Sequence, residues 1–146
     1  MIKKIYICCV LVLAMCVSSA VAKDVKEKYS VKKAFEFAKV KALFPGNIKF
    51  YWGKQHHPPV VKKFGTYKTS KRTNGFAKKR DYACSLAMAS ALSALQDRAV
   101  REGGNAVINI VSNIKNHPES STKEFSCLAG AMMVNVALQG TVVTIK

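Results

Sequence analysis

A basic segment between positions 62 and 80 holds the residue types that could recognise a charged partner. It carries eight cations and no acid, and Phe64, Tyr67 and Phe76 lie between the cations. Cations that contact phosphate groups and rings that stack on bases can hold nucleic acid. In an exported protein the same residues would meet lipopolysaccharide phosphates, anionic lipid head groups or acidic wall polymers. A solvated charged surface is the other interpretation. The candidate anion-binding residues are Lys62, Lys63, Lys68, Lys71, Arg72, Lys78, Lys79 and Arg80.

Three histidines are the other residues that could support chemistry. His56 and His57 precede two prolines and His117 precedes one, so all three belong to predicted loops. They are metal-ligand candidates, but adjacent histidines point apart in an extended chain, and solvated loop histidines are the alternative. No Walker motif, HExxH or GxSxG pattern occurs. We therefore expect no enzymatic activity and no cofactor, with a small hydrolase as the alternative.

A glycine pair in the stretch REGGNAVINIVSN could form a phosphate-binding loop or a turn. Phosphate loops run from a strand through glycines to a helix N-terminus, whose free N–H groups hold the anion. Here a predicted helix comes first, and a predicted strand follows Gly103 and Gly104. This order favours a helix C-terminus and a turn, with Ile108 and Ile110 facing the core.

The first 22 residues have the pattern of a secretory signal peptide. Two lysines precede an apolar run over 5–17, and small residues follow, with alanine at the last and third-last positions. We expect cleavage between Ala22 and Lys23, and a periplasmic protein whose mature chain has no transmembrane segment. An uncleaved membrane anchor is the alternative. Lipidation at Cys16 is disfavoured, because the large Met15 precedes it.

Removal of residues 1–22 leaves a strongly basic chain with two cysteines. It keeps 22 basic and 8 acidic residues, a net charge of about +14. Two thiols in an oxidising compartment usually pair, so we expect a structural disulfide between Cys84 and Cys127. A redox pair usually has CxxC spacing, and a metal site usually has further ligands nearby. Neither pattern occurs in the sequence.

Helical periodicity predicts two amphipathic helices. The first covers about 30–43 and begins at Ser30. Its apolar face consists of Val31, Phe35, Ala38 and Ala42. The second covers about 81–102, with Asp81 as its cap. Its apolar stripe consists of Cys84, Met88, Ala91, Leu95 and Ala99.

Alternating apolar and polar residues predict the strands. Runs at 48–53 and 60–73 are β-branched and aromatic, with a bulge expected at Gly65. Three further strands are expected after position 105, arranged as an antiparallel meander, with a bulge at Gly140.

Together these elements predict an α+β domain. We expect a two-layer sandwich in which the helix over 81–102 packs on a mostly antiparallel sheet of about five strands. A single domain over 23–146 would divide into an N-terminal helical segment, 23–46, and a sheet-plus-helix core, 47–146. Because Cys84 lies on the apolar stripe of the helix and Cys127 on the inward face of a strand, a disulfide between them would join the two layers.

Four stretches resemble a family of small exported bacterial proteins that genomes often label "excinuclease ATPase subunit". They are "IKFYWGKQ…VVKKFGTYKTSKRTNGF", "ACSLAMASALSALQDRA", "GGNAVINIVS" and "STKEFSCLAGAMMVNVALQG", and together they cover nearly all of 23–146. The unit of a helix, a GxNAV turn and a strand is also similar to the RcsF-like stress-sensing outer-membrane lipoprotein and to YbjQ-like domains.

The resemblance implies a disulfide-joined envelope domain that acts by contact. An excinuclease ATPase needs a Walker motif, which this sequence lacks. The chain also departs from the lipoprotein in having no good lipidation site. We therefore expect a non-catalytic interaction or sensing module that contacts an anionic envelope component or an envelope protein. Nucleic-acid binding, or a small redox or hydrolytic activity, is the alternative.

Overall fold

The computed structural model of the protein describes residues 23–146. The expected signal peptide over 1–22, with cleavage after Ala22 and the lipidation considered at Cys16, lies outside the described residues. Among the described helices, none combines the length and the apolar character needed to cross a membrane.

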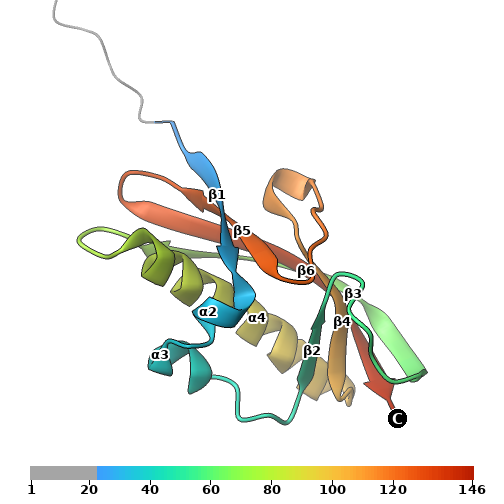
Figure 1. The fold of residues 1–146 in the computed structure, drawn as a ribbon. Helices are drawn as coiled ribbons and strands as arrows, with labels where there is room; N and C mark the ends of the chain where they lie inside the picture. The colour runs from blue at the N-terminus through green and yellow to red at the C-terminus, as the bar shows by residue number, and fades with distance from the viewer. Residues whose placement is uncertain (1–22) are drawn as a thin grey trace, which may run out of the picture.

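Residues 23–146 form six strands, three α-helices and one 3-10 helix (Figure 1). In chain order they are β1 (Val25–Ser30), α2 (Val31–Ala34), α3 (Ala38–Lys41), β2 (Lys49–Trp52), β3 (Val60–Asn74), α4 (Arg80–Glu102), β4 (Ala106–Ser112), η1 (Ile114–Asn116), β5 (Glu124–Ala129) and β6 (Met133–Ile145).

The sheet is organised around β6. One edge of β6 pairs with β3 along nearly its whole length, and the other edge pairs first with β5 and then with β4. β1 adds to the outer side of β5 as an antiparallel strand, and β2 adds to β4 as a parallel one. The expected meander of the last three strands is therefore wrong. β4 and β5 share one edge of β6 instead of following one another across the sheet.

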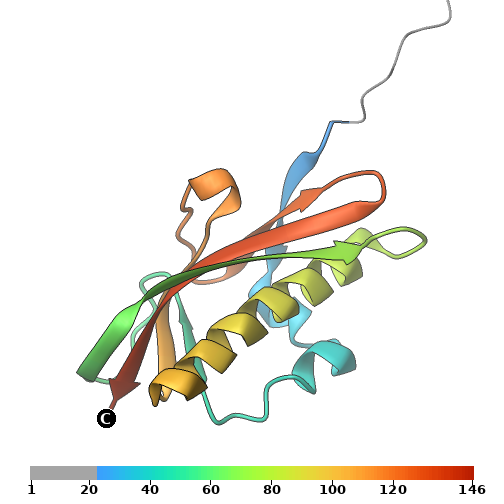
Figure 2. The same ribbon diagram turned by 180° about the vertical axis from the view of Figure 1, so that it is seen from behind.

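The expected two-layer sandwich is also wrong, because the sheet curls into a half-barrel around one side of α4 (Figures 1 and 2). Long strands accumulate the right-handed twist of each residue, and β3 and β6 span 15 and 13 residues. Bulges add further bending. The expected bulge at Gly65 is present, since the register with β6 shifts between Lys63 and Gly65. Opposite Gly140, the bulge belongs to β4, where Asn109 has a φ of 50°.

The expected helix over 30–43 does not form as one piece. Residues 25–30 are a strand instead, and two four-residue helices, α2 and α3, follow it. Ser30 does begin a helix as expected, because its Oγ accepts a hydrogen bond from the backbone N–H of Lys33 at 3.3 Å.

The break between α2 and α3 allows two phenylalanines to pack inward. Residues two apart lie on nearly opposite sides of a continuous helix, so Phe35 and Phe37 could not both face one core there. Here the Phe35 ring lies 5.3 Å from Phe44, and the Phe37 ring lies 5.0 Å from Tyr82, measured between ring centroids. Both side chains pack against the main hydrophobic core.

The long helix α4 supplies the centre of that core. Its predicted apolar stripe is confirmed, because all five of its residues are at most 1% exposed. Gly103 ends the helix in the left-handed conformation, with a φ of 78°, as expected. The expected cap at Asp81 is wrong: the N-cap is Lys79, and Asp81 lies in the first turn, where its Oδ1 accepts from the N–H of Tyr82 at 2.8 Å.

A disulfide joins the start of α4 to β5. The Sγ atoms of Cys84 and Cys127 lie 2.10 Å apart, and both residues are fully buried. This is the pairing expected from the sequence, and it links the helix to the sheet.

Candidate site for contact with an anionic surface

The basic segment does not form one patch, because most of it is an extended strand. Lys62 and Lys63 lie near the end of β3 that pairs with the C-terminal part of β6. Lys71 faces α4 and lines a groove with Arg98 of that helix. Lys68 and Arg101 also line that groove, which therefore gathers two of the eight cations of the segment, while Lys62 and Lys63 lie apart from it.

Two other members of the segment face away from α4. Arg72 lies opposite Asn135 of β6, which in turn lies opposite Leu128. Since side chains alternate along a strand and Cys127 faces the helix, Leu128, Asn135 and Arg72 share the outer face. Lys68 comes four residues before Arg72 and therefore lies on the same face of β3. Its Nζ donates to the Oδ1 of Asn116 in η1 at 3.2 Å.

The aromatic residues of the segment divide in a similar way. Phe64 and Tyr67 pack against the core. The Tyr67 ring lies 4.1 Å below the guanidinium of Arg98, and its hydroxyl donates to Glu102 at 3.0 Å. Desolvation and then the bond to Glu102 raise the pKa of Tyr67. Phe76, in contrast, is 64% exposed.

Phe76 belongs to what we call the loop end. This is the end of the molecule where the β3–α4 loop (75–79), the β5–β6 turn (130–132) and the start of β1 lie side by side (Figures 1 and 2). The backbone N–H of Gly75 donates to the carbonyl of Met132 at 2.8 Å and so joins the first two segments. Loops that are distant in the sequence therefore meet at the loop end.

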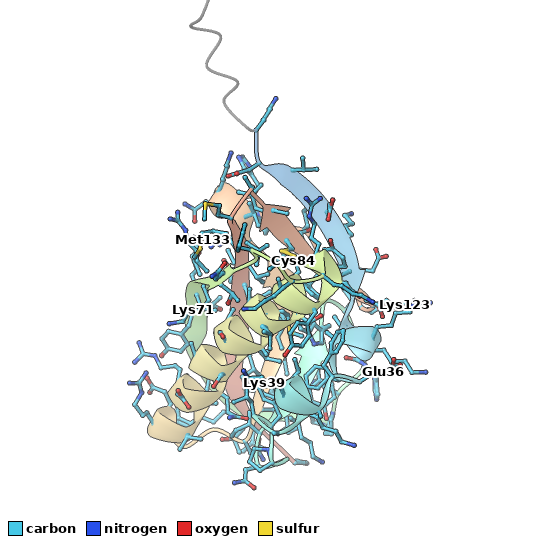
Figure 3. All side chains as sticks on the ribbon, turned by 90° about the vertical axis from the view of Figure 1, so that its left-hand side faces the viewer. Glu36, Lys39, Lys71, Cys84, Lys123 and Met133 are labelled. Atoms are coloured by element: carbon cyan, nitrogen blue, oxygen red, sulfur yellow. A yellow bond between two sulfur atoms is a disulfide. The ribbon has the colours of Figure 1, made fainter. Side chains whose placement is uncertain are left out.

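Exposed apolar side chains gather at the loop end. Phe76 is 64% exposed, Met132 62%, Val25 52% and Met133 46%. Figure 3 shows Met133 near the end where β1 begins. Single exposed apolar residues are common on protein surfaces, but a group of them at one tip indicates an interaction site.

Local hydrogen bonds hold Phe76 outward. The Oδ1 of Asn74 accepts from the backbone N–H of Phe76 at 2.8 Å, and the Nζ of Lys78 donates to the carbonyl of Asn74 at 3.1 Å. Ala77 has a φ of 56°, a conformation that costs a non-glycine residue about 1 kcal/mol. The loop is therefore a defined turn that presents an aromatic side chain to solvent.

Cations surround these apolar side chains. The exposed cations at or beside the loop end are Lys23, Arg72, Lys78 and Lys79. The next cation, Arg80, is bound to Glu27 at 2.9 Å. The hydroxyl of Tyr29 also donates to Glu27, and these bonds, that of Tyr29 foremost, lower the pKa of the Glu27 carboxyl.

Two further acids, Asp24 and Asp81, also lie at or beside the loop end. Its four exposed cations outnumber them, and Glu27 is neutralised by Arg80. The loop end therefore has a positive net charge.

A groove of about 530 Å³ extends from the loop end across the outer face of the sheet. Met132 and Met133 lie at one side of it, and its lining includes Arg72, Lys115 and the acid Asp24. Lys115 has a φ of 53°, so the backbone of η1 is strained where this cation faces the groove.

Sequence reasoning missed Lys115, Met132 and Met133. Lys115 stands alone between asparagine and isoleucine, and no local pattern relates it to β3. Met133 is assigned to a strand, as the structure has it, but the sequence GAMM with its glycine could also have indicated a turn with exposed apolar residues.

The structure does not bring the three histidines together. Within residues 23–146, no three potential ligands of the His, Cys, Asp or Glu type lie close enough to hold a metal ion. The Nδ1 of His57 lies 2.8 Å from the carbonyl oxygen of Pro58, and its ring packs on Tyr51. His56 and His117 are exposed.

The geometry of the loop end thus combines apolar tips, a surrounding group of cations and an adjoining groove. Such a combination can contact a surface that is anionic outside and apolar beneath. The resemblance to exported proteins labelled as excinuclease subunits, and to RcsF-like domains, stays a prediction, because comparison of this chain with family models, curated proteins and solved structures finds no match.

Proposed function

We propose that the protein is a non-catalytic interaction module of the cell envelope that attaches to an anionic lipid surface by its loop end. The observation that supports this is the gathering of Phe76, Met132, Met133 and Val25 beside exposed cations. Export to the periplasm, expected from the signal-peptide pattern, would give the protein access to such a surface. Cleavage before Lys23 would place a positive α-amino group at the same end.

The expected energy of attachment is moderate. Each lysine or arginine near an anionic bilayer contributes about 1 kcal/mol. Full burial of a phenylalanine or methionine side chain contributes about 1.5–3 kcal/mol, and these residues bury only their exposed parts on insertion. A few such contributions, less the freedom lost on binding, give reversible attachment.

Two features favour lipid over nucleic acid. Phe64 and Tyr67, which could have stacked on bases, pack inward, and Tyr67 is already engaged by Arg98 and Glu102. Phe76 is grouped with methionines, whose flexible side chains suit insertion between lipids more than stacking on planar bases.

Flotation with lipid vesicles tests the proposal. The protein should bind vesicles that contain phosphatidylglycerol and bind pure phosphatidylcholine vesicles much more weakly. Raising the salt concentration from 0.05 to about 0.5 M should weaken the binding, because salt screens exposed charges. Binding of equal strength to both vesicle types, or binding that salt leaves unchanged, would contradict the electrostatic part.

Matched variants separate the loop end from the general charge of the protein. Phe76→Ser with Met132→Ser should lower the partition coefficient about tenfold or more, whereas Val61→Ser with Val100→Ser, which are 62% and 60% exposed elsewhere, should not. A similar loss in both pairs would place the contact elsewhere.

A second pair of variants tests the cations. Lys78→Gln with Lys79→Gln should weaken binding more than Lys62→Gln with Lys63→Gln at the other end of β3. Both pairs remove the same number of charges, so an equal effect would show attraction by net charge alone.

A further inference from the structure

A second candidate site lies between two short parts of the sheet, the pair β1–β5 and the pair β2–β4. β5 and β4 pair with the same edge of β6, and β1 and β2 then add to β5 and β4, so that two separate pairs of strands extend from this edge. Between them is a pocket of about 580 Å³, lined from α2, from β2 and from the segment before β5. It is separate from the groove at the loop end.

The wall of this pocket is mostly apolar and aromatic. Phe35, Phe50, Trp52 and Val31 line it. Phe44 packs behind two of these rings, with centroid distances of 5.3 Å to Phe35 and 5.4 Å to Phe50. Phe35, Phe44 and Phe50 therefore form one aromatic cluster that packs against the core, and Trp52 belongs to the core itself.

All the charged side chains that line the pocket are positive. Lys32 and Lys123 line it together with uncharged polar residues, and none of the described residues that line it is acidic. Both lysines are exposed, and Figure 3 shows Lys123 on the side of the molecule that carries the α2–α3 region. The site therefore suits a ligand with an apolar body and an anionic group.

Backbone contacts hold the pocket open in a fixed shape. The N–H of Val31 donates to the carbonyl of Lys123 at 2.9 Å, which joins α2 to the segment before β5. A Cβ atom on Gly53 would lie 2.9 Å from the Oγ of Ser120, so this segment rests directly on the end of β2. These contacts fix α2, the end of β2 and the segment before β5 relative to one another around the pocket.

An added peptide strand is a poorer occupant than a small molecule. Strand addition would use free backbone groups along the outer edge of β2. The N–H of Trp52 is already bound by the side chain of Gln55, whose Oε1 lies 3.0 Å away. We propose that this pocket binds the acyl chain of a single-chain anionic amphiphile, with Lys32 and Lys123 facing the head group.

Trp52 is the sole tryptophan of the sequence, so its fluorescence reports on this pocket directly. Titration with decanoate below its micelle concentration should give a saturable change. Decanol, which has no charge, and decyltrimethylammonium, which has the opposite charge, should bind several-fold more weakly. Equal affinity for all three compounds, or no saturable change with decanoate, would overturn the proposal.

Chain length provides a second measurement. Each buried CH₂ contributes about fourfold in affinity, so decanoate should bind up to about fifteenfold more tightly than octanoate. Affinities that do not depend on chain length would show that the apolar wall is not in contact with the chain.

Charge variants test the head-group contact. Lys32→Gln with Lys123→Gln should weaken decanoate binding about five- to tenfold and leave decanol binding unchanged, as expected for two partly exposed ion pairs. Lys39→Gln with Lys41→Gln on α3 removes the same charge outside the lining and should have little effect. Equal losses in both pairs would overturn the assignment of the head group to this site. Because the probe is a dissolved single molecule, failure here is distinguishable from failure of vesicle binding.

Discussion

Removal of the disulfide between Cys84 and Cys127 should destabilise the protein by about 4 kcal/mol. The cross-link closes a loop of 43 residues. In the chain-entropy model, a loop of that length loses an entropy worth about 4 kcal/mol at 25 °C in the unfolded state. A domain of this size has a total stability of roughly 5–15 kcal/mol, so the loss is a large fraction of it.

The measurement is urea unfolding of the protein and of the Cys84→Ala, Cys127→Ala double variant, followed by Trp52 fluorescence. The variant should unfold at a lower urea concentration. The free energy of unfolding of the variant should also fall more steeply with urea concentration, because an unfolded chain without the cross-link is more expanded and exposes more surface. Unfolding of the unmodified protein with a reductant present should show a similar loss, which separates the cross-link from the packing of the substituted side chains.

Burial determines how the bond responds to reductant. Both cysteines are fully buried, so a thiol reagent reaches the bond only through unfolding. Folded protein that lacks residues 1–22, and with them Cys8, Cys9 and Cys16, should show no free thiol on titration, and reduction should be fast only in denaturant. A loss of stability below about 1 kcal/mol, or thiols that titrate in the folded protein, would refute this reasoning.

Three further predictions concern the core and the strand edges. Gly140→Ala should destabilise the fold by about 1–3 kcal/mol, because the new Cβ would lie 2.6 Å from a methyl of Val107; a urea midpoint at or above that of the unmodified protein would contradict this. Met88→Ala empties a fully buried position of α4 and should lower the free energy of unfolding by about 2–5 kcal/mol in the same assay. Glu119 accepts from Lys26 and from Ser126, the bond from Lys26 being the larger cause, and its pKa lies below the ordinary value of 4.5. Its contribution to stability is therefore present above pH 4.5 and lost as the pH falls through the lowered pKa, so Glu119→Gln should flatten the dependence of the urea midpoint between pH 6 and 3.

The parts of the fold that follow from local periodicity could be predicted from the sequence. The stripe of α4 and the glycine that ends this helix depend on residues close in the chain, and both are present. The alternation of β3 and its bulge at Gly65 are also local features.

The errors arise where tertiary contacts override local propensity. Residues 25–30 are rich in lysine and glutamate, yet they form β1 because β5 offers an edge to pair with. The periodicity over 30–43 predicts one helix, but Phe35 and Phe37 both pack inward, and the segment forms two four-residue helices instead. The curl of the sheet depends on the accumulated twist of β3 and β6, which a hydrophobic pattern does not report.

The candidate site was only partly predictable for a related reason. A strand of 15 residues extends about 50 Å, so the cations of β3 could not have formed one patch. Lys78 and Lys79 reach the loop end because they follow the strand, whereas Lys115 reaches the groove from a different element. The apolar residues of the loop end come from three separate parts of the chain, and the pairing of β1 with β5, and of β3 and β5 with β6, brings them together.

The position of the disulfide connects the stability of the fold with the proposed contact surface. Cys84 lies in the first turns of α4, directly after the 75–79 loop, and Cys127 lies just before the 130–132 turn. The bond therefore joins the bases of the two loops whose tips carry Phe76 and Met132, while the hydrogen bond from Gly75 to Met132 joins them nearer the tips. Because a loop that is already ordered loses less freedom on binding, this double linkage favours attachment as well as folding. The same covalent bond would then have two consequences: it limits the unfolded chain, and it holds the apolar tips in one place for contact with a surface.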